Sequence, residues 1–217
     1  MKRHFYYLIL LFALSCNNER VIQLPEIENA KISEVLDVSP AYLFYDESQS
    51  DSTLLNRKNL ISTTNWLINV DKRLSLIQAI PHIKFLQDKK RNAQMHKNEN
   101  AKNYFTCKDT SLWNLGFMEF TDTYYMNYDR ASKSIEVSCF MIIESLNDIS
   151  FSTSLDPNTT LSSDNIEQSL ETIIRECGKD EKNFLVLNPN LSFQNYFSLK
   201  NVLRPLQNRI SNNEFIY

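Results

Sequence analysis

The sequence predicts an α+β fold whose mixed sheet has a C-terminal unit ordered strand, strand, helix, strand, helix, strand. Apolar residues recur at helical spacing from Ile166 to Cys177, which predicts an amphipathic helix. Residues 184–187 are all apolar and are followed by Asn-Pro-Asn, which predicts a buried strand that ends in a turn. A second apolar periodicity begins at Phe193 and predicts the second helix.

The residues that flank these two helices predict where each begins and ends. Asp164 and Glu167 have the spacing of a capping box, and Gly178 stands where a helix C-cap favours glycine. Ser192 is a candidate N-cap for the second helix. Pro205 must kink that helix or end it near Arg204, because proline lacks the N–H and its ring clashes with the preceding turn. Residues 214–217 then predict a short closing strand.

The N-terminal half predicts a similar mixture of strands and helices. Strands are expected at 41–45 and 66–70, and a short helix at 54–61. Ser75 can cap a helix that runs from Leu76 to about Lys90, in which Pro81 predicts a kink or a late start. The remaining segments are a charged, Asn-rich loop at 89–102, an ambiguous stretch at 104–109, an aromatic stretch with β character at 115–128, and strands at 134–144 and 149–153.

An internal echo relates the two halves of the chain. Leu74-Ser75 aligns with Leu191-Ser192, 117 positions later, and Val70 then falls on Leu187. This register indicates a duplicated unit. The alternative, that any strand, turn and helix look alike at this level, stays open.

Length and composition set the broad class. The 217 residues allow one or two domains, and the 42% apolar and 23% charged residues are ordinary for a globular protein. We expect a signal peptide at 1–15, a tether at 16–32, an N-terminal α/β segment at 33–103 and a C-terminal α+β segment at 104–217. The net charge of −3 without a basic block gives no support to nucleic acid as a partner.

The N-terminus carries a targeting pattern. Lys2 and Arg3 precede ten apolar residues at 5–14, a length that fits a signal peptide and is too short for a bilayer span. Cys16 follows directly and resembles the modified cysteine of bacterial lipoproteins, although the usual Leu and small residue are here Ala13 and Leu14. The resemblance implies lipidation at Cys16 and a membrane-anchored protein that faces the periplasm or the cell surface. A plain secretory signal or a retained N-terminal anchor are the alternatives.

The element order from residue 134 to 217 resembles the periplasmic domain of the ExbD/TolR family of envelope proteins. The similar features are the strands at 135–143 and 149–153, the helix at 166–177, and the strand at 184–187 with its polar turn before the second helix. The resemblance implies a periplasmic interaction domain without enzymatic activity, which binds a peptide or protein at a sheet edge. The family carries an Asp in a transmembrane helix, whereas residues 5–14 of this chain contain no acid, which puts a motor function in doubt.

Histidines and cysteines offer little support for metal or cofactor chemistry. The chain has His4, His82 and His96 and lacks paired His or Cys at zinc spacing, so no metal and no cofactor are predicted. Besides Cys16 the cysteines are Cys107, Cys139 and Cys177, of which Cys139 and Cys177 lie on inward-facing patterns and are expected to be core thiols. One disulfide with one cysteine left over is also consistent with an exported chain. Cys107 with His82 or His96 is the only nucleophile pair to consider.

Acidic and aromatic residues give two further candidate sites. Asp46, Glu47 and Asp71 each follow a predicted strand, so their carboxylates could meet at strand ends. Solvated loop acids are the competing interpretation. Six aromatic residues could form a binding face for a glycan or a peptide, or could be core: Trp113, Phe117, Phe120, Tyr124, Tyr125 and Tyr128.

The sequence therefore favours a cell-envelope lipoprotein that acts as a non-enzymatic binding or scaffolding module with an envelope protein or peptide partner. The alternatives are a secreted hydrolase that uses carboxylates or Cys107, and a carbohydrate- or peptide-binding module. A cleft with converging acids would favour the hydrolase. An open sheet edge or an exposed aromatic patch would favour binding.

Overall fold

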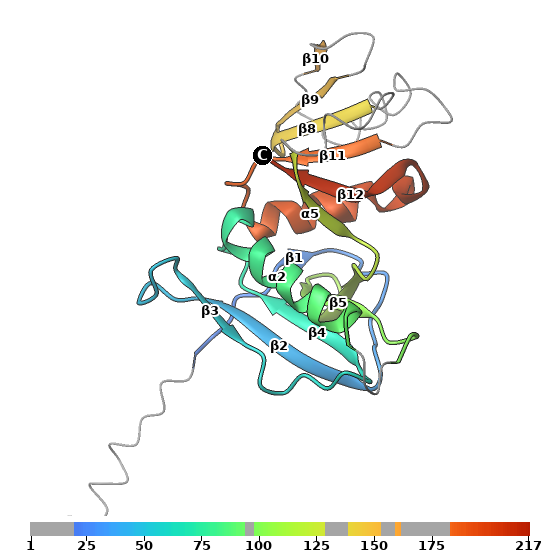
Figure 1. The fold of residues 1–217 in the computed structure, drawn as a ribbon. Coiled ribbons are helices and arrows are strands. Elements are labelled where there is room, and N and C mark those ends of the chain that lie inside the picture. Colours follow the sequence, from blue (N-terminus) through green and yellow to red (C-terminus); the bar gives the residue numbers. More distant parts are fainter. Residues whose placement is uncertain (1–19, 94–97, 129–138, 153–158, 162–182) are drawn as a thin grey trace, which may run out of the picture.

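The computed structural model describes residues 20–93, 98–128, 139–152, 159–161 and 183–217. Figure 1 shows two sheets with helices α2 (Leu76–Arg91) and α5 (Phe193–Leu203) between them. This arrangement confirms the predicted α+β class and its mixed sheets. Within the described residues, no helix is long and apolar enough to cross a membrane.

The first sheet has the order β1-β5-β4-β2-β3, with β6 paired to β5. Strands β1, β5, β4 and β2 are parallel, whereas β3 and β6 are antiparallel to their neighbours. Helix α2 makes the crossover from β4 to β5 that a parallel pair requires. The strands are β1 (Glu26–Ile27), β2 (Val38–Tyr45), β3 (Thr53–Asn56), β4 (Asn65–Val70), β5 (Asn103–Asp109) and β6 (Asn114–Glu119).

The second sheet has the order β10-β9-β8-β11-β12-β7. Helix α5 makes the crossover from β11 to β12, and a 3-10 helix, η1 (Arg204–Arg209), follows it. Strands β8, β11, β12 and β7 are parallel, and β9 is antiparallel to β8. The strands are β7 (Tyr124–Asn127), β8 (Cys139–Ser145), β9 (Asp148–Ser152), β10 (Thr159–Leu161), β11 (Asn183–Leu187) and β12 (Ile210–Ile216).

The two sheets repeat one topology. The order β1-β5-β4-β2-β3 corresponds strand by strand to β7-β12-β11-β8-β9, with the same parallel or antiparallel relation at every step. We name β1–β5 with α2 the first unit, and β7–β12 with α5 the second unit. The internal echo thus corresponds to two units of one fold.

The two units meet at their helix starts through reciprocal hydrogen bonds. Leu76 N donates to Leu191 O at 2.9 Å, and Phe193 N, 117 positions after Leu76, donates to Leu74 O at 2.6 Å. One further pair obeys the same offset: Ile77 N to Pro189 O at 2.9 Å and Gln194 N to Lys72 O at 3.2 Å. Equivalent donors and acceptors therefore exchange across a local two-fold axis.

Both units share one hydrophobic core. Phe105 on β5 stacks on Phe120 with ring centroids 3.7 Å apart and meets the edges of Phe193 and Phe197 on α5, at 5.2 Å and 6.5 Å. A residue of the first unit is thus packed by the helix of the second. The boundary expected at residues 103 and 104 is corrected, because β5 and β6 complete the first sheet.

The described helices begin where their capping residues predict. Ser192 accepts a hydrogen bond from Asn195 N at 3.2 Å, and Gln78 accepts one from Ser75 N at 2.9 Å. Helix α5 ends at Leu203, so Pro205 ends the helix as predicted. Helix α2 begins at Leu76 although it contains Pro81, so the late start considered for this helix is not observed.

Two other expectations on local structure have different outcomes. Residues 54–61 were expected to be helical, but β3 covers Thr53–Asn56 because pairing with β2 overrides a weak local preference. The helix expected at 166–177 lies outside the described residues.

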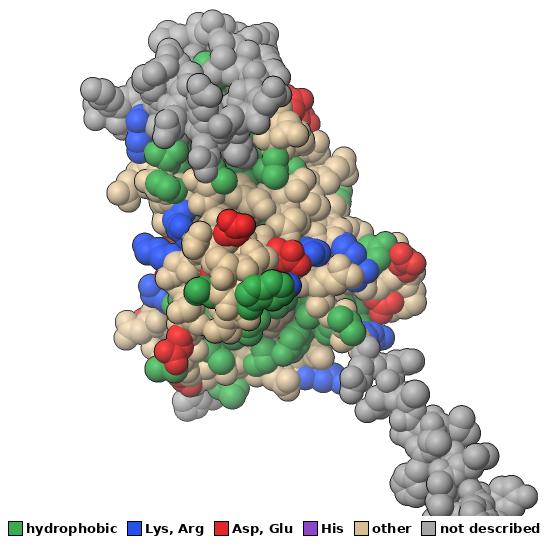
Figure 2. Space-filling view, turned by 180° about the vertical axis from the view of Figure 1, so that it is seen from behind, with side chains coloured by type: hydrophobic (Ala, Val, Ile, Leu, Met, Phe, Trp, Pro, Cys, Tyr) green, Lys and Arg blue, Asp and Glu red, His purple; other side chains and the backbone are tan. Residues whose placement is uncertain are grey.

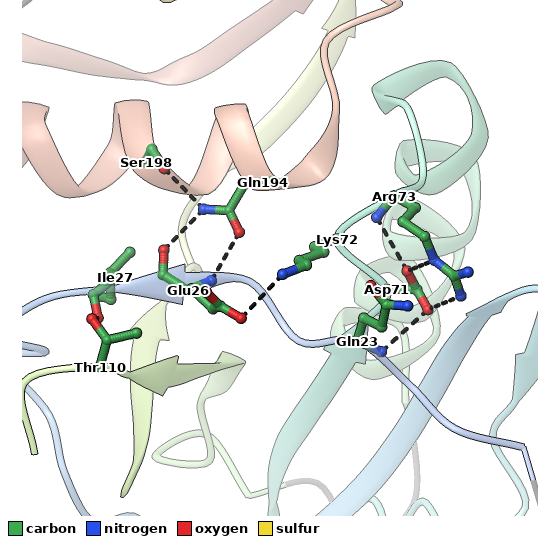
Figure 3. Close-up of polar contacts among 9 residues, drawn as sticks. All are labelled: Gln23, Glu26, Ile27, Asp71, Lys72, Arg73, Thr110, Gln194 and Ser198. Atoms are coloured by element: carbon green, nitrogen blue, oxygen red, sulfur yellow. Dashed lines mark hydrogen bonds and ion pairs between the residues drawn. The ribbon is translucent and has the colours of Figure 1, made fainter. Parts of the chain in front are cut away.

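The backbone of the N-terminal segment is hydrogen-bonded to the fold from Gln23 onwards, as Figure 3 shows, and the Arg20 side chain already lies 3.5 Å from Asp46 Oδ2. Gln23 N donates to Asp71 Oδ2 at 3.2 Å, and Lys72 Nζ lies 3.0 Å from Glu26 Oε1. The side-chain amide of Gln194 binds the backbone N–H and C=O of Glu26, both at 2.9 Å. The tether expected at 16–32 is therefore corrected to end before Gln23. This segment is held mainly through its backbone groups. Such contacts do not require a periodic pattern of apolar residues, so the sequence did not reveal them.

Candidate functional site

A pocket of about 280 Å³ opens where the two units meet. Its wall is formed by the segment from Ile27 to Ile32, residues 117–123 around the β6–β7 connection, the last turn of α5, the start of η1 and the start of β12. We call it the inter-unit pocket. Clefts at such junctions are frequent ligand sites, because two surfaces supply converging side chains.

A buried polar network extends from this pocket into the core. Lys200 lines the pocket and forms an ion pair with Glu214, whose side chain is fully buried. Tyr196 donates to Glu214 Oε2 at 2.8 Å, and its oxygen lies 3.0 Å from the Tyr125 hydroxyl. Burial and the nearby Glu214 charge raise the pKa of both tyrosines well above the usual value, so both stay neutral donors.

The first unit has apolar residues at the matching positions. Tyr196 and Lys200 lie 117 positions after Ala79 and Ile83 on α2, and both of those residues are buried. Glu214 pairs with Leu185, while Phe105 pairs with the equivalent Ile68. The fold therefore does not require charged residues at the positions of Lys200 and Glu214. Burying an ion pair costs desolvation that apolar packing avoids, so a structural need does not explain the second unit's network.

The charges around the pocket do not cancel. The acids Glu119 and Asp122 both act on Lys102, which lies 2.9 Å from Glu119 Oε2. Lys200 is neutralised by Glu214. Arg204 donates to the carbonyl of Asn29 at 3.3 Å, which is an uncharged partner. Counted with Lys102 and Glu214, the wall has four cations and three acids, so a net positive charge of one remains.

One buried acceptor at the pocket has no hydrogen-bond partner among the described residues. Asn201 lies on the last turn of α5 and lines the pocket, and its side-chain oxygen is buried and unpaired. An unpaired buried acceptor is costly, and a ligand N–H or O–H can satisfy it.

Asp109 positions the segment that forms part of the pocket wall. Its carboxylate accepts from Ala30 N at 2.7 Å, and from the hydroxyl and the N–H of Ser111 at 2.6 Å and 2.9 Å. The Ser111 hydroxyl, followed by these backbone donors, lowers the pKa of Asp109 to about 2.

Asp109→Asn is expected to lower stability at pH 7 and to remove a pH dependence. Because the folded pKa lies below the unfolded value, the stabilisation is present above about pH 4 and is lost as the pH falls to about 2. Denaturant midpoints measured from pH 7 to pH 2 should therefore converge for wild type and variant. Glu34→Gln, at an exposed position, is the control. A constant gap over this pH range would contradict the prediction.

Cys107 and His82 do not form a nucleophile pair. Cys107 faces the core from β5 and is fully buried, and burial raises the pKa of its thiol to about 12. His82 Nε2 lies 2.9 Å from Thr53 Oγ1 on β3, and strands β4 and β2 separate β3 from β5. The other candidate partner, His96, lies outside the described residues.

Cys107 is expected to resist alkylation in the folded protein, because the thiolate is the reacting species and burial disfavours it. Iodoacetamide at pH 8 should label Cys107 only after denaturation, as measured by peptide mass spectrometry. Labelling of Cys107 in the native protein at the rate of free cysteine would refute this expectation.

The predicted strand-end acids are bonded within their own turns. Asp71 is fully buried and accepts from Arg73 Nε at 2.9 Å and Nη2 at 2.8 Å. Asp46 accepts from Ser48 Oγ at 2.6 Å, and Glu47 accepts from the Tyr45 hydroxyl at 3.0 Å. The described structure therefore engages these carboxylates in structural contacts.

The six aromatic candidates do not form a single face. Phe120 and Tyr125 are buried, and Phe117 and Phe120 line the inter-unit pocket. The Arg91 guanidinium lies over the Tyr124 ring, with its carbon 4.2 Å from the ring centroid. Trp113 is 81% exposed. Figure 2 shows hydrophobic side chains at the surface of the half that carries the first sheet.

Of the remaining cysteines, only Cys139 lies in the described part of the chain. Cys139 is disulfide-bonded, so the expectation of a core thiol is wrong at this position. Cys177 and the lipidation candidate Cys16 lie outside the described residues. Within the described ranges, no group of three or more His, Cys, Asp or Glu side chains is placed to hold a metal ion.

Sequence reasoning missed Lys200 and Glu214. A signal was available, because extending the 117-residue offset along α5 places polar Tyr196 and Lys200 over apolar Ala79 and Ile83. Glu214 could not be found in this way, because the chain from the helix start to the next strand is shorter in the second unit. Strand β12 begins 17 positions after the start of α5, whereas β5 begins 27 positions after the start of α2, so the constant offset is lost.

Comparison with known proteins yields no relative. No protein-family model, no curated protein and no solved structure matches this chain. The class that the described structure defines is thus an α+β protein of two topologically equivalent units with a pocket between them.

Proposed function

We propose that this protein is a lipid-anchored binding module of the bacterial cell envelope and that the inter-unit pocket is its ligand site. The N-terminal pattern ending at Cys16 supports the anchor. The described structure supports the pocket. The scaffolding role implied by the resemblance to the ExbD/TolR periplasmic domain is supported by element order alone: β8, β9, β11, α5 and β12 follow that order.

The observation that carries the binding function is the network of Lys200, Glu214 and Tyr196 at the pocket. The first unit fills the equivalent positions with Ala79, Ile83 and Phe105. The same fold accommodates apolar residues at these positions in the first unit. The polar residues of the second unit therefore favour a role in ligand recognition. Catalysis by Cys107 is disfavoured because the thiol is buried and distant from His82.

The bound N-terminal segment adds a geometric consequence to the anchor. From Cys16 to Gln23 there are seven chain steps, which span at most about 25 Å when fully extended. Because Gln23 is held by Asp71 and Lys72, the first unit must remain within that distance of the lipid anchor. The module therefore acts close to the membrane surface.

The test compares wild type with Cys16→Ala in a bacterial host, by intact mass and by membrane fractionation. Wild type should be cleaved before Cys16, carry acyl mass and sediment with membranes, whereas the variant should do none of these. Identical behaviour of the two proteins would refute the anchor. The pocket is tested separately by ligand binding to the full chain, as described below.

A further inference from the structure

We propose that the inter-unit pocket binds the C-terminal residue of a peptide, or an equivalent N-acyl amino acid. This inference rests on the proposed function, because it requires that the pocket is a ligand site. Such a ligand combines a carboxylate, an amide N–H next to it and an apolar side chain. The pocket presents a complement to each of these three groups.

The carboxylate is matched by Arg204 and Lys31, the two lining cations that form no ion pair among the described residues. Arg204 donates to the carbonyl of Asn29 through Nη1 at 3.3 Å, which leaves its other guanidinium N–H groups for a ligand. Lys31 lies on the same wall, in the segment that Asp109 holds through Ala30. Arginine binds a carboxylate through two parallel hydrogen bonds, and a nearby lysine adds charge.

The amide N–H is matched by Asn201. Its side-chain oxygen is buried beneath the pocket surface without a partner among the described residues, so a turn of the side chain toward the pocket would let it accept a hydrogen bond from the ligand. Asn201 precedes Arg204 by three residues. Arg204 follows the last residue of α5 with helical backbone angles and begins η1, and both residues line the pocket.

The apolar side chain is matched by the pocket lining. Ile27, Phe120 and Leu203 are buried core residues that also line the pocket. The volume of about 280 Å³ suits one amino-acid residue with its acyl group rather than a folded partner. Lys200 also borders this space, and its ion pair with Glu214 fixes the position of the ammonium at the pocket.

Three matched probes test the proposal by calorimetry or ligand-detected NMR on the full-length chain. N-acetyl-leucine carries all three groups, N-acetyl-leucinamide lacks the charge, and N-acetyl-N-methyl-leucine lacks the N–H. The acid should bind about tenfold more tightly than the amide and about fivefold more tightly than the N-methyl acid. Its affinity should fall as salt screens the cations.

Charge variants locate the site. Arg204→Gln and Lys31→Gln should each lower the binding affinity for N-acetyl-leucine about tenfold. The affinity for N-acetyl-leucinamide should not change. Arg57→Gln, a surface arginine over Phe85 and not part of the pocket wall, is the matched control and should bind like wild type.

Two results would overturn the proposal. Equal binding of the acid and the amide would show a ligand site without carboxylate recognition, which leaves the proposed binding function intact. Absence of binding for all three probes at millimolar concentration, or binding unaffected by both charge variants, would remove the assignment of this ligand class. Membrane attachment through Cys16 is measured in a separate experiment, and its outcome does not depend on these binding results.

Discussion

Phe105→Ala is expected to lower the free energy of unfolding by about 3–5 kcal/mol, the usual cost of removing a buried ring. Phe105 is 1% exposed, stacks on Phe120 and contacts both Phe193 and Phe197 of α5. The resulting cavity would border both units at once. We therefore expect one unfolding transition at lower denaturant, without separation of the two units.

The control for Phe105→Ala is Phe85→Ala on the outer side of α2. Phe85 is 45% exposed, so its truncation should cost far less. Unfolding is followed by far-ultraviolet circular dichroism and by fluorescence of Trp66, which is buried in the first unit. Two separate transitions in wild type, or a small effect of Phe105→Ala, would show that the units do not share one core.

Lys200→Met is expected to lower the free energy of unfolding by about 3–5 kcal/mol, because it leaves a buried carboxylate without its counter-charge. Glu214 is fully buried, and its described partners are the Lys200 ammonium and the neutral Tyr196 hydroxyl. One hydroxyl donor does not compensate a desolvated charge. Denaturant titration at pH 7 measures this loss.

Two comparison proteins show whether the loss comes from the charge. Lys102→Met breaks the surface pair with Glu119 and should change stability much less, because solvent screens that pair. A triple variant, Tyr196→Ala with Lys200→Ile and Glu214→Phe, gives the second unit the residues of the first. It removes the charge together with its partners and should lose less than Lys200→Met. A larger loss in the triple variant would mean that the network is structural.

Much of the local structure could be predicted because it depends on residues within one turn. Ser75 and Ser192 stand directly before their helices, and Pro205 ends α5 because it cannot supply a backbone N–H. The apolar run before Asn188 became β11 for the same local reason. The echo at 117 residues was visible because the strand, turn and cap repeat in register.

The α+β class, the starts of α2 and α5, and the repetition of a strand–turn–helix segment follow from local patterns in the sequence. The folded structure was needed to show that β5 belongs to the first sheet, that backbone hydrogen bonds to the fold begin at Gln23, and that Glu214 contacts Lys200. These outcomes depend on contacts between distant positions. Propensity and capping act over a few residues, whereas strand pairing and burial of charge are decided by which segments the folded chain brings together.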